Sequence, residues 1–322
     1  MEKLKAWLSS TPYARFHLSL ASADASFRKY YRLSLGDESV LVMDASLEKE
    51  SLLPFLDVTK RLHEVGVRAP HVHAKNLEAG YLIIEDFGSE HYLDLLNEAN
   101  FHTLYAHAID TIAAMQQADA TALPPYDKAY LHFEMDLMQE WYLEKLLAHT
   151  LSPAQKELVA RTLEHISQEV LAQPQGVFVQ RDFHSRNIMA CGKNLGIIDY
   201  QDAMSGALTY DLVSLLKDCY VRFPREEIIK LALSFRDKKA LDVDDATFIR
   251  WFDFTGLQRH IKVLGIFSRL YLRDAKEGYL KDIPLTLGYT IEAAKLYEET
   301  QEFAELLEIL AKYKLDSVSS TE

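Results

Sequence analysis

Glycine and cysteine are both scarce in this chain. Its 322 residues include 12 glycines and two cysteines, Cys191 and Cys219. Two cysteines cannot build the disulfide framework that stabilises small secreted domains, and so low a number fits a reducing cytoplasm. No glycine occurs in the stretch ASADASFRKYY, residues 21–31, which excludes a glycine-rich phosphate-binding loop at that position.

Long apolar runs and an excess of positive charge are missing as well. The first residues, MEKLKAWLSSTPYARF, lack the apolar segment of a signal peptide, and no stretch reaches the roughly 20 apolar residues of a membrane-spanning helix. Asp and Glu number 48 against 35 Lys and Arg, so the net charge is -13, which disfavours binding to nucleic-acid phosphates. We therefore expect a cytoplasmic protein with no membrane and no nucleic acid as partner.

The apolar residues that are present predict two domains of different character. They make up 48% of the chain, enough for a large divided core. Strand patterns flank the turn Gly36-Asp37, a helical pattern covers 47–66, and a second strand pair ends in YLIIEDFG. Longer helical patterns then follow, at 92–120, 134–149 and 153–173. We predict an α+β protein with a small β-rich N-lobe, residues 1–88, and a larger, mostly helical C-lobe, residues 89–322.

One stretch past the middle of the chain places polar residues at the ends of short apolar runs: VFVQRDFHSRNIMACGKNLGIIDYQDA, residues 177–203. The first run leads into a loop that carries Asp182 and Asn187, and the second run ends in Asp199. Two neighbouring strand ends can bring these groups to one point. Such a point suits Mg²⁺, which binds one or two carboxylates together with phosphate and water oxygens. Asp182 would then accept a proton from an attacking hydroxyl.

Acids and amides at strand ends also occur in ordinary turns. Here, however, their spacing resembles the kinase catalytic loop, in which an Asp is followed five residues later by an Asn, with a second Asp at the metal. With IDYQD in place of DFG, and TYDLVSLLKDCY after it, the chain is similar to the aminoglycoside-phosphotransferase-like small-molecule kinases. The resemblance implies a two-lobe protein-kinase-like fold, Asp182 as catalytic residue, Asn187 and Asp199 at the metal, and Asp211 bracing the loop. Gln180 replaces the family's usual His, and its amide can still donate and accept hydrogen bonds.

The nucleotide end departs from the protein kinases. The strand lysine is missing, because VLVMDA places Met43 where the kinase pattern has it. Phosphate contacts would fall to Ser26, Arg28 and Lys29, and the neutralising charge would come from Arg28, Lys29 or Arg32. The alternative is a solvated basic turn. The resemblance implies ATP as phosphate donor, with its adenine at the backbone of the segment between the lobes, from Glu85 to Phe87.

The acceptor would face the segment RWFDFTGLQRHIKVLGIFSRLYLRD, residues 250–274, which is apolar around much of its circumference, as expected of a buried helix. The longer segment WFDFTGLQRHIKVLGIFSRLYLRDAKEGYLKDIP, residues 251–284, is similar to the cell-wall amino-sugar kinases, which phosphorylate the anomeric hydroxyl of N-acetylmuramate and N-acetylglucosamine. The likeness extends to ADASFRKYYRL, VMDA, IEDFG and IIDYQDA. The resemblance implies an amino-sugar substrate and a role in peptidoglycan recycling. The sugar would meet Trp251 or Tyr200 with its apolar face, and Arg259 or His260 with its polar groups. The alternatives are a core histidine at 260 and a salt-bridged edge at 259.

Two other functions stay open. The same chemistry could serve another hydroxyl, such as that of an aminoglycoside or a choline-like molecule, although Arg259 and Lys262 would oppose a polycationic acceptor. A protein acceptor is disfavoured because no A-P-E element follows IDYQD. The scarce glycines, Met43 and Gln180 would also suit a catalytically inactive nucleotide-binding scaffold, but the residues expected to perform the chemistry are all present.

Overall fold

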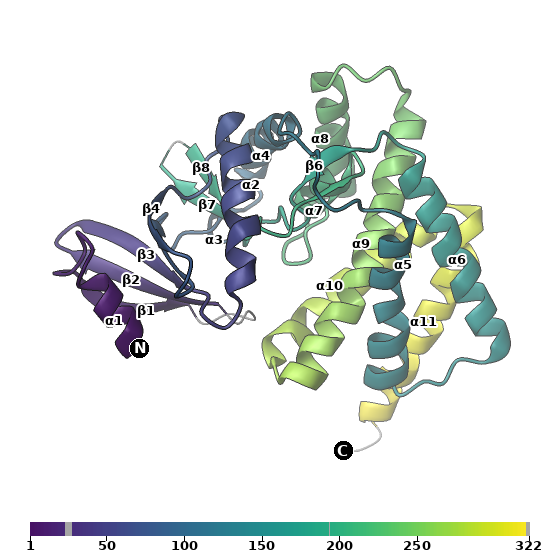
Figure 1. The fold of residues 1–322 in the computed structure, drawn as a ribbon. Helices are drawn as coiled ribbons and strands as arrows, with labels where there is room; N and C mark the ends of the chain where they lie inside the picture. The colour runs from purple at the N-terminus through teal and green to yellow at the C-terminus, as the bar shows by residue number, and fades with distance from the viewer. Residues whose placement is uncertain (23–27, 193, 320–322) are drawn as a thin grey trace.

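The computed structural model describes residues 1–22, 28–192 and 194–319. Figure 1 shows a sheet at one end of the molecule, a group of long helices at the other, and α2 standing between them. The sheet has five antiparallel strands in the order β1-β2-β3-β5-β4. Their bounds are β1 (His17–Ser22), β2 (Lys29–Leu35), β3 (Glu38–Asp44), β4 (Val72–Asn76) and β5 (Tyr81–Glu85). The α+β, two-lobe arrangement predicted from the sequence is confirmed.

The hairpin of β2 and β3 forms where the sequence predicts it. Leu35 pairs with Glu38, and Gly36 takes the left-handed backbone (φ 60°) that the tight turn needs. One face of the sheet packs against α1 (Glu2–Leu8), which the sequence patterns did not predict, and the other face turns toward α2. Met43 lies on the second face, fully buried in the core, so this strand position serves packing.

The helix α2 (Leu52–Glu64), preceded by the short η1 (Lys49–Ser51), joins the sheet to the rest of the protein. Its buried residues Phe55, Val58 and Leu62 repeat at helical spacing, and the chain leaves the helix through Gly66 at φ 74°. These residues belong to a core that also contains Leu82 of β5 and Ile197 beyond the middle of the chain. Because this core contains residues from both sides of the predicted boundary at residues 88 and 89, that boundary stays a prediction.

The C-terminal part is built of helices. They are α3 (Tyr92–Leu95), α4 (Phe101–Met115), α5 (Lys128–Leu137), the π-helix η2 (Met138–Leu146), α6 (Pro153–Leu171), α7 (Tyr210–Leu216), α8 (Arg225–Lys238), α9 (Asp245–Asp274), η3 (Glu277–Asp282), α10 (Ile283–Ala294) and α11 (Glu298–Ser319). The predicted helix at 153–173 is confirmed, with Ser152 in a capping box. The pattern at 92–120 divides into α3 and α4, and that at 134–149 falls in the end of α5 and in η2.

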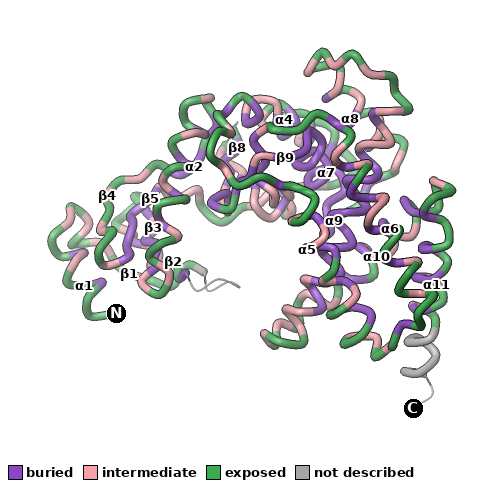
Figure 2. The backbone as a smooth tube through the Cα atoms, turned by 45° about the vertical axis from the view of Figure 1, so that its right-hand side comes forward, coloured by how far each residue is buried: buried purple, intermediate pink, exposed green. Residues whose placement is uncertain are grey.

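The buried helix predicted near residue 260 is confirmed as α9, the axis of the C-lobe. Figure 2 shows buried residues concentrated along α9 and α7, with exposed residues on the outer turns of the surrounding helices. A second core cluster joins α9 to α5, α6, α10 and α11. Among the described residues, none of the helices combines the length and apolar character needed to span a bilayer.

Four short strands surround the polar stretch, and their pairing corrects the sequence interpretation. The runs before Asp182 and Asp199 are not partners of each other. The first forms β6 (Val177–Val179), which pairs with β9 (Met204–Gly206), whereas β7 (Ile188–Cys191) pairs with β8 (Asn194–Ile197). The two hairpins are nevertheless joined, because the Gln180 side chain donates to the carbonyls of Ile198 and Asp199 at 3.0 and 3.2 Å.

Gly265 of α9 provides a test of this packing. A Cβ at this position would lie 2.6 Å from the carbonyl oxygen of Leu137, where α5 ends against α9. We predict that Gly265→Ala lowers the free energy of unfolding by about 1–3 kcal/mol through overpacking, measured by urea denaturation. Gly288→Ala in α10, where the nearest atom lies at 4.0 Å, is the control and should be neutral or stabilising by up to about 1 kcal/mol. Equal effects of the two substitutions would contradict the close approach.

Candidate active site

The loop that carries Asp182 is anchored by a buried carboxylate on α7. Asp211 accepts hydrogen bonds from the backbone N–H groups of Gln180 at 2.8 Å and Arg181 at 2.9 Å. Arg181 has φ 80°, a left-handed conformation that costs a non-glycine residue energy and persists only where neighbours hold it. Burial raises the pKa of Asp211 to about 7, although the two hydrogen bonds act to lower it. This geometry is consistent with the bracing role that the sequence suggests for Asp211.

The remaining groups of Arg181 are also held. Its carbonyl accepts hydrogen bonds from Arg259 Nη1 at 2.7 Å and Ser214 Oγ at 3.2 Å. Its guanidinium donates to Glu134 Oε1 at 2.5 Å, and Glu134 is itself buried and paired with Lys262 at 2.9 Å. These contacts fix both the backbone and the side chain of Arg181. They therefore also fix the position of the next residue, Asp182.

Asp182 is the exposed member of this charged group. Its side chain is 41% exposed, and Arg259 Nη1 lies 3.5 Å from Oδ1. Removal from bulk water would raise the pKa of Asp182, but the positive charges of Lys262 and Arg259 outweigh that effect and hold the pKa below its usual value. Asp182 is therefore an ionised carboxylate at neutral pH that can accept a hydrogen bond.

Asn187 and Asp199 lie close to Asp182. Asn187 Nδ2 donates to the Asp182 carbonyl at 3.0 Å, and the Ile198 N–H donates to the Asn187 carbonyl at 3.0 Å, which ties the hairpin of β7 and β8 to the loop. Asp199 has φ 59°, and its Oδ1 accepts a hydrogen bond from Gln201 Nε2 at 2.9 Å. Burial raises the pKa of Asp199, and the nearby negative charge of Asp182 adds to the effect. The Asn187 amide and the Asp199 carboxylate thus both lie near the exposed acid, beside opposite strands of the β7–β8 hairpin.

Two acidic residues that position the loop were missed in the sequence. Asp218, just after α7, is buried and accepts hydrogen bonds from the N–H groups of Ser185 at 2.8 Å and Tyr220 at 3.0 Å. Glu134 holds Arg181 from α5. Asp218 lies in TYDLVSLLKDCY, a stretch in which the sequence analysis gave a role to Asp211 alone, and Glu134 belongs to no motif that the sequence analysis used. For Glu134 the only signal was a single acid within a helical pattern, which is usually a solvated side chain.

The basic residues predicted to contact the nucleotide phosphates lie in three different environments. Arg28 is buried directly before β2, and its Nε donates to Ser51 Oγ at 3.3 Å. Its charge lowers the pKa of Asp199 against the larger effect of burial. Lys29 is exposed at the start of β2. Arg32 forms a bidentate ion pair with Asp86 at 2.6 and 3.0 Å, so its charge is already balanced. The predicted Ser26 lies outside the described residues.

The segment between the lobes is fixed on both sides. The Glu85 N–H donates to the His71 carbonyl at 2.8 Å and the Glu85 side chain pairs with Arg68 at 2.7 Å, so neither group faces a ligand freely. Phe87 packs on Gly196 of β8, where a Cβ would lie 2.5 Å from the ring. The Glu85 N–H and side chain are therefore occupied, and adenine contact by the other backbone groups from Glu85 to Phe87 stays a prediction.

The acceptor residues predicted from the sequence need correction. Tyr200 is fully buried, stacks on Phe55 at 5.1 Å and shares a hydrogen bond with Thr59 at 2.8 Å, so it fastens α2 to the segment after Asp199. His260 is a buried core histidine, with Nε2 2.9 Å from the Lys217 carbonyl.

Arg259 also differs from the expectation of direct sugar contact, whereas the sugar contact of Trp251 stays a prediction. Trp251 is partly buried beside Phe248, with ring centroids 6.4 Å apart, and packs on the largest core cluster. Arg259 is only 3% exposed and turns toward Arg181 and Asp182. Of the four predicted acceptor residues, Arg259 alone makes a described contact with Asp182.

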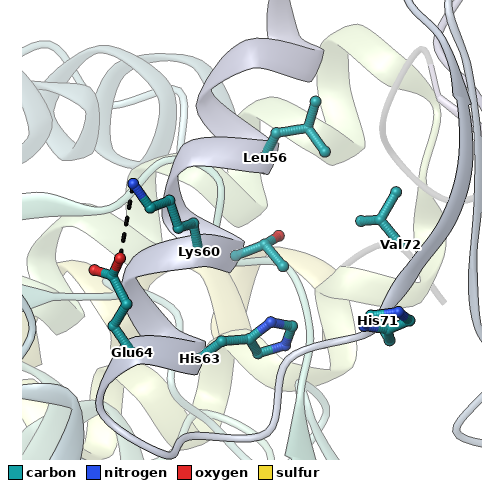
Figure 3. A pocket seen from close by; sticks show the side chains of 7 residues that line it. Leu56, Lys60, His63, Glu64, His71 and Val72 are labelled. Carbon is teal, nitrogen blue, oxygen red and sulfur yellow. Dashed lines mark ion pairs between the residues drawn. The ribbon is translucent and has the colours of Figure 1, made fainter.

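A pocket of about 390 Å³ lies elsewhere, between α2 and the start of β4 (Figure 3). Figure 3 shows His63 and Leu56 on the helix, facing His71 and Val72 across the opening. None of its lining residues belongs to the loop of Asp182 or to the segment of Asp199. The pocket therefore shares no lining residue with these two segments, although Thr59, which lines it, shares a hydrogen bond with Tyr200 next to Asp199.

Comparison with known proteins identifies the family. The model of the phosphotransferase enzyme family matches residues 17–241, more than half of the chain. The chain belongs to this family. The N-acetylmuramate/N-acetylglucosamine kinase of Pseudomonas aeruginosa is 40% identical to it over 294 residues, which cover 89% of this chain and 86% of that protein. The protein of the same name from Neisseria meningitidis is 36% identical, with 98% and 97% of the two chains covered.

Solved structures of phosphotransferases share the fold. The ADP-bound aminoglycoside phosphotransferase APH(2'')-Ib superposes with a TM-score of 0.61 at 18% identity, over 91% of this chain and 97% of that one. A choline/ethanolamine kinase family protein from Mesorhizobium loti gives a TM-score of 0.63 at 14% identity, over 96% and 98%. At these identities the likeness supports the two-lobe fold, and it does not distinguish between acceptors.

The brace formed by Asp211 predicts a pH dependence. A protonated Asp211 cannot accept both N–H bonds, so kcat should decline as the pH falls below about 7, the pKa of this carboxyl group. Asp211→Asn presents an amide N–H₂ to one of the two donors and should lower kcat by roughly tenfold to a hundredfold through misplacement of Asp182. It should also remove that acidic limb from the kcat profile. A variant that keeps the wild-type limb would show that another group causes it.

Proposed function

We propose that this protein transfers the terminal phosphoryl group of ATP to the anomeric hydroxyl of N-acetylmuramate, N-acetylglucosamine or both. The product is the sugar 1-phosphate, formed in the cytoplasm during peptidoglycan recycling. The observation that carries the proposal is the 40% and 36% identity, over most of both chains, to two proteins named N-acetylmuramate/N-acetylglucosamine kinase. The arrangement of Asp182, Asn187 and Asp199 supports the chemistry that this substrate assignment requires.

In this proposal Asp182 positions the acceptor and takes its proton. The anomeric hydroxyl is the most acidic hydroxyl of the sugar, so a carboxylate whose pKa is low can still accept from it. In a loose transition state little proton removal is needed early, and alignment of the attacking oxygen dominates catalysis. Arg259 and Lys262 keep Asp182 ionised and therefore able to accept the hydrogen bond.

Asn187 and Asp199 are the proposed ligands of Mg²⁺. The oxygen donors of an amide and a carboxylate suit this ion, which also uses phosphate and water oxygens. The raised pKa of Asp199 reflects a carboxylate that burial and neighbouring acids leave short of positive charge, which a cation would supply. Bound Mg²⁺ would neutralise charge on the transferring phosphoryl group. Arg28, whose charge acts on Asp199, is the proposed phosphate contact from the N-lobe.

The charges around Asp182 do not by themselves select the acceptor. Arg181, Arg259 and Lys262 lie beside Asp182 and Glu134 on the C-lobe side of the site. The carboxyl groups of Asp199, Asp211 and Asp218 surround the same loop, so no excess of positive charge results. The substrate proposal therefore rests on the sequence relatives.

The substrate is tested by ADP release from ATP and Mg²⁺ with a panel of acceptors. We expect turnover with N-acetylmuramate or N-acetylglucosamine, and rates with kanamycin and choline that do not exceed the background of ATP hydrolysis. Turnover with an aminoglycoside or choline alone would contradict the sugar as substrate, but it would still support a kinase. No turnover with any acceptor would favour an inactive nucleotide-binding protein.

Asp182→Asn tests the proposed base. The amide keeps the shape of the side chain but cannot take a proton, so kcat should fall by roughly 10²–10⁴ while the affinity for ATP stays nearly unchanged. The matched comparison is Asn187→Ala, which should instead raise the Mg²⁺ concentration needed for half-maximal rate. Wild-type turnover in Asp182→Asn would remove this residue from the mechanism.

A further inference from the structure

The structure buries Arg259 and His260, the two residues that the sequence suggested as contacts of the sugar's polar groups, so the carboxylate of the proposed acceptor needs another partner. Arg259 is only 3% exposed and Lys262 only 4%, and both are committed to neighbours in the charged group. Arg181 is 14% exposed and bound to Glu134. Arg186, in the same loop and next to Asn187, is 34% exposed. Among these four described cations, Arg186 therefore offers the largest accessible surface.

Arg186 is held in place while its donors remain available. Its guanidinium carbon lies 3.6 Å from the centroid of the Tyr220 ring, a close cation–π contact that fixes the plane of the group. Its backbone carbonyl accepts a hydrogen bond from His91 Nδ1 at 2.7 Å. No hydrogen bond from the Arg186 side chain to another described residue is formed, and its Nη2 lies 3.7 Å from Asp282 Oδ2.

Asp282 is the carboxylate beside the Arg186 guanidinium. It stands where η3 meets α10, and its Oδ2 is buried without a hydrogen-bond partner among the described residues. The spacing of 3.7 Å between Asp282 and Arg186 is longer than a hydrogen bond, so the pair is incompletely satisfied. Both partners of the guanidinium, Tyr220 and Asp282, come from the C-lobe, whereas the proposed nucleotide contacts come from the N-lobe and the segment joining the lobes.

We infer that Arg186, stacked on Tyr220, binds the carboxylate of an anionic acceptor and selects it over an uncharged one. The inference rests on the proposed function and names the residue that sets acceptor preference within it. A planar guanidinium with available donors matches a carboxylate in a bidentate arrangement, and stacking reduces the entropy lost on binding. Arg186 belongs to the loop of Asp182, so the loop that aligns the attacking hydroxyl also holds the charged end of the sugar.

The test compares three acceptors: N-acetylmuramate, its uncharged amide, and N-acetylglucosamine, which lacks the lactyl group. Arg186→Gln should lower kcat/KM for N-acetylmuramate by roughly tenfold to a hundredfold, chiefly through KM, since it loses a charge-assisted contact. The kcat/KM for N-acetylglucosamine should change by less than about threefold. This sugar has no lactyl carboxylate, so it does not use the contact that the substitution removes. The wild-type preference for the acid over its amide should disappear.

Arg250→Gln is the control. Arg250 is 28% exposed and lies over the Phe254 ring at 4.6 Å, but it pairs with Glu169 and Glu299 away from the loop of Asp182. It should leave the ratio of acid to amide unchanged. Arg186→Lys keeps the charge and should retain part of the preference, so it decides the question if thermal melting shows that Arg186→Gln does not fold.

The outcomes separate the inference from the proposed function. Equal losses for all three acceptors would place Arg186 at the phosphates or in the structure of the loop and overturn the inference. An unchanged ratio of acid to amide in both Arg186 variants would also overturn it. If the wild type turns over neither sugar, the proposed function fails, and the inference fails with it.

Discussion

The carboxylate of Asp211 is the contact on which the candidate site depends. It accepts two successive backbone N–H groups and so holds Arg181 in a left-handed conformation that a non-glycine residue rarely adopts. Asp182 follows directly, and its own carbonyl accepts the amide of Asn187. The positions of the exposed acid and the proposed metal ligand are therefore linked to one buried side chain on α7. Asp211 is consequently a structural requirement of the loop, without being proposed to touch substrate.

Around this loop, burial and neighbouring cations have opposite effects on the pKa values of the carboxyl groups. Glu134 is buried, which would raise its pKa, but Lys262 and Arg181 lower it, and the carboxylate remains ionised. The same cations, with Arg259, act on Asp182 as well. Buried charges of this kind are costly unless each has a partner, and removal of one member leaves another unpaired. The group thus keeps Asp182 ionised at neutral pH.

The sequence was sufficient for elements that depend on local patterns and for residues that belong to a motif. The turn at Gly36, the helix before Gly66 and the buried helix α9 follow from periodicity, and the roles proposed for Asp182 and Asp211 follow from the kinase resemblance. Partner choice was not predictable, because β6 and β8 are runs of three and four residues that carry no information about pairing.

Side-chain exposure was the other property that the sequence could not supply. The sequence favours Tyr200 and His260 as acceptor contacts, but packing against α2 and the C-lobe core buries both. Glu134 gave no local signal because its partners are distant in sequence. The central claim, transfer to the anomeric hydroxyl, is tested most directly by ³¹P NMR of the product formed from sugar labelled with ¹³C at C1. The account predicts phosphorus–carbon coupling to C1; a phosphate without that coupling, on another hydroxyl, would contradict it.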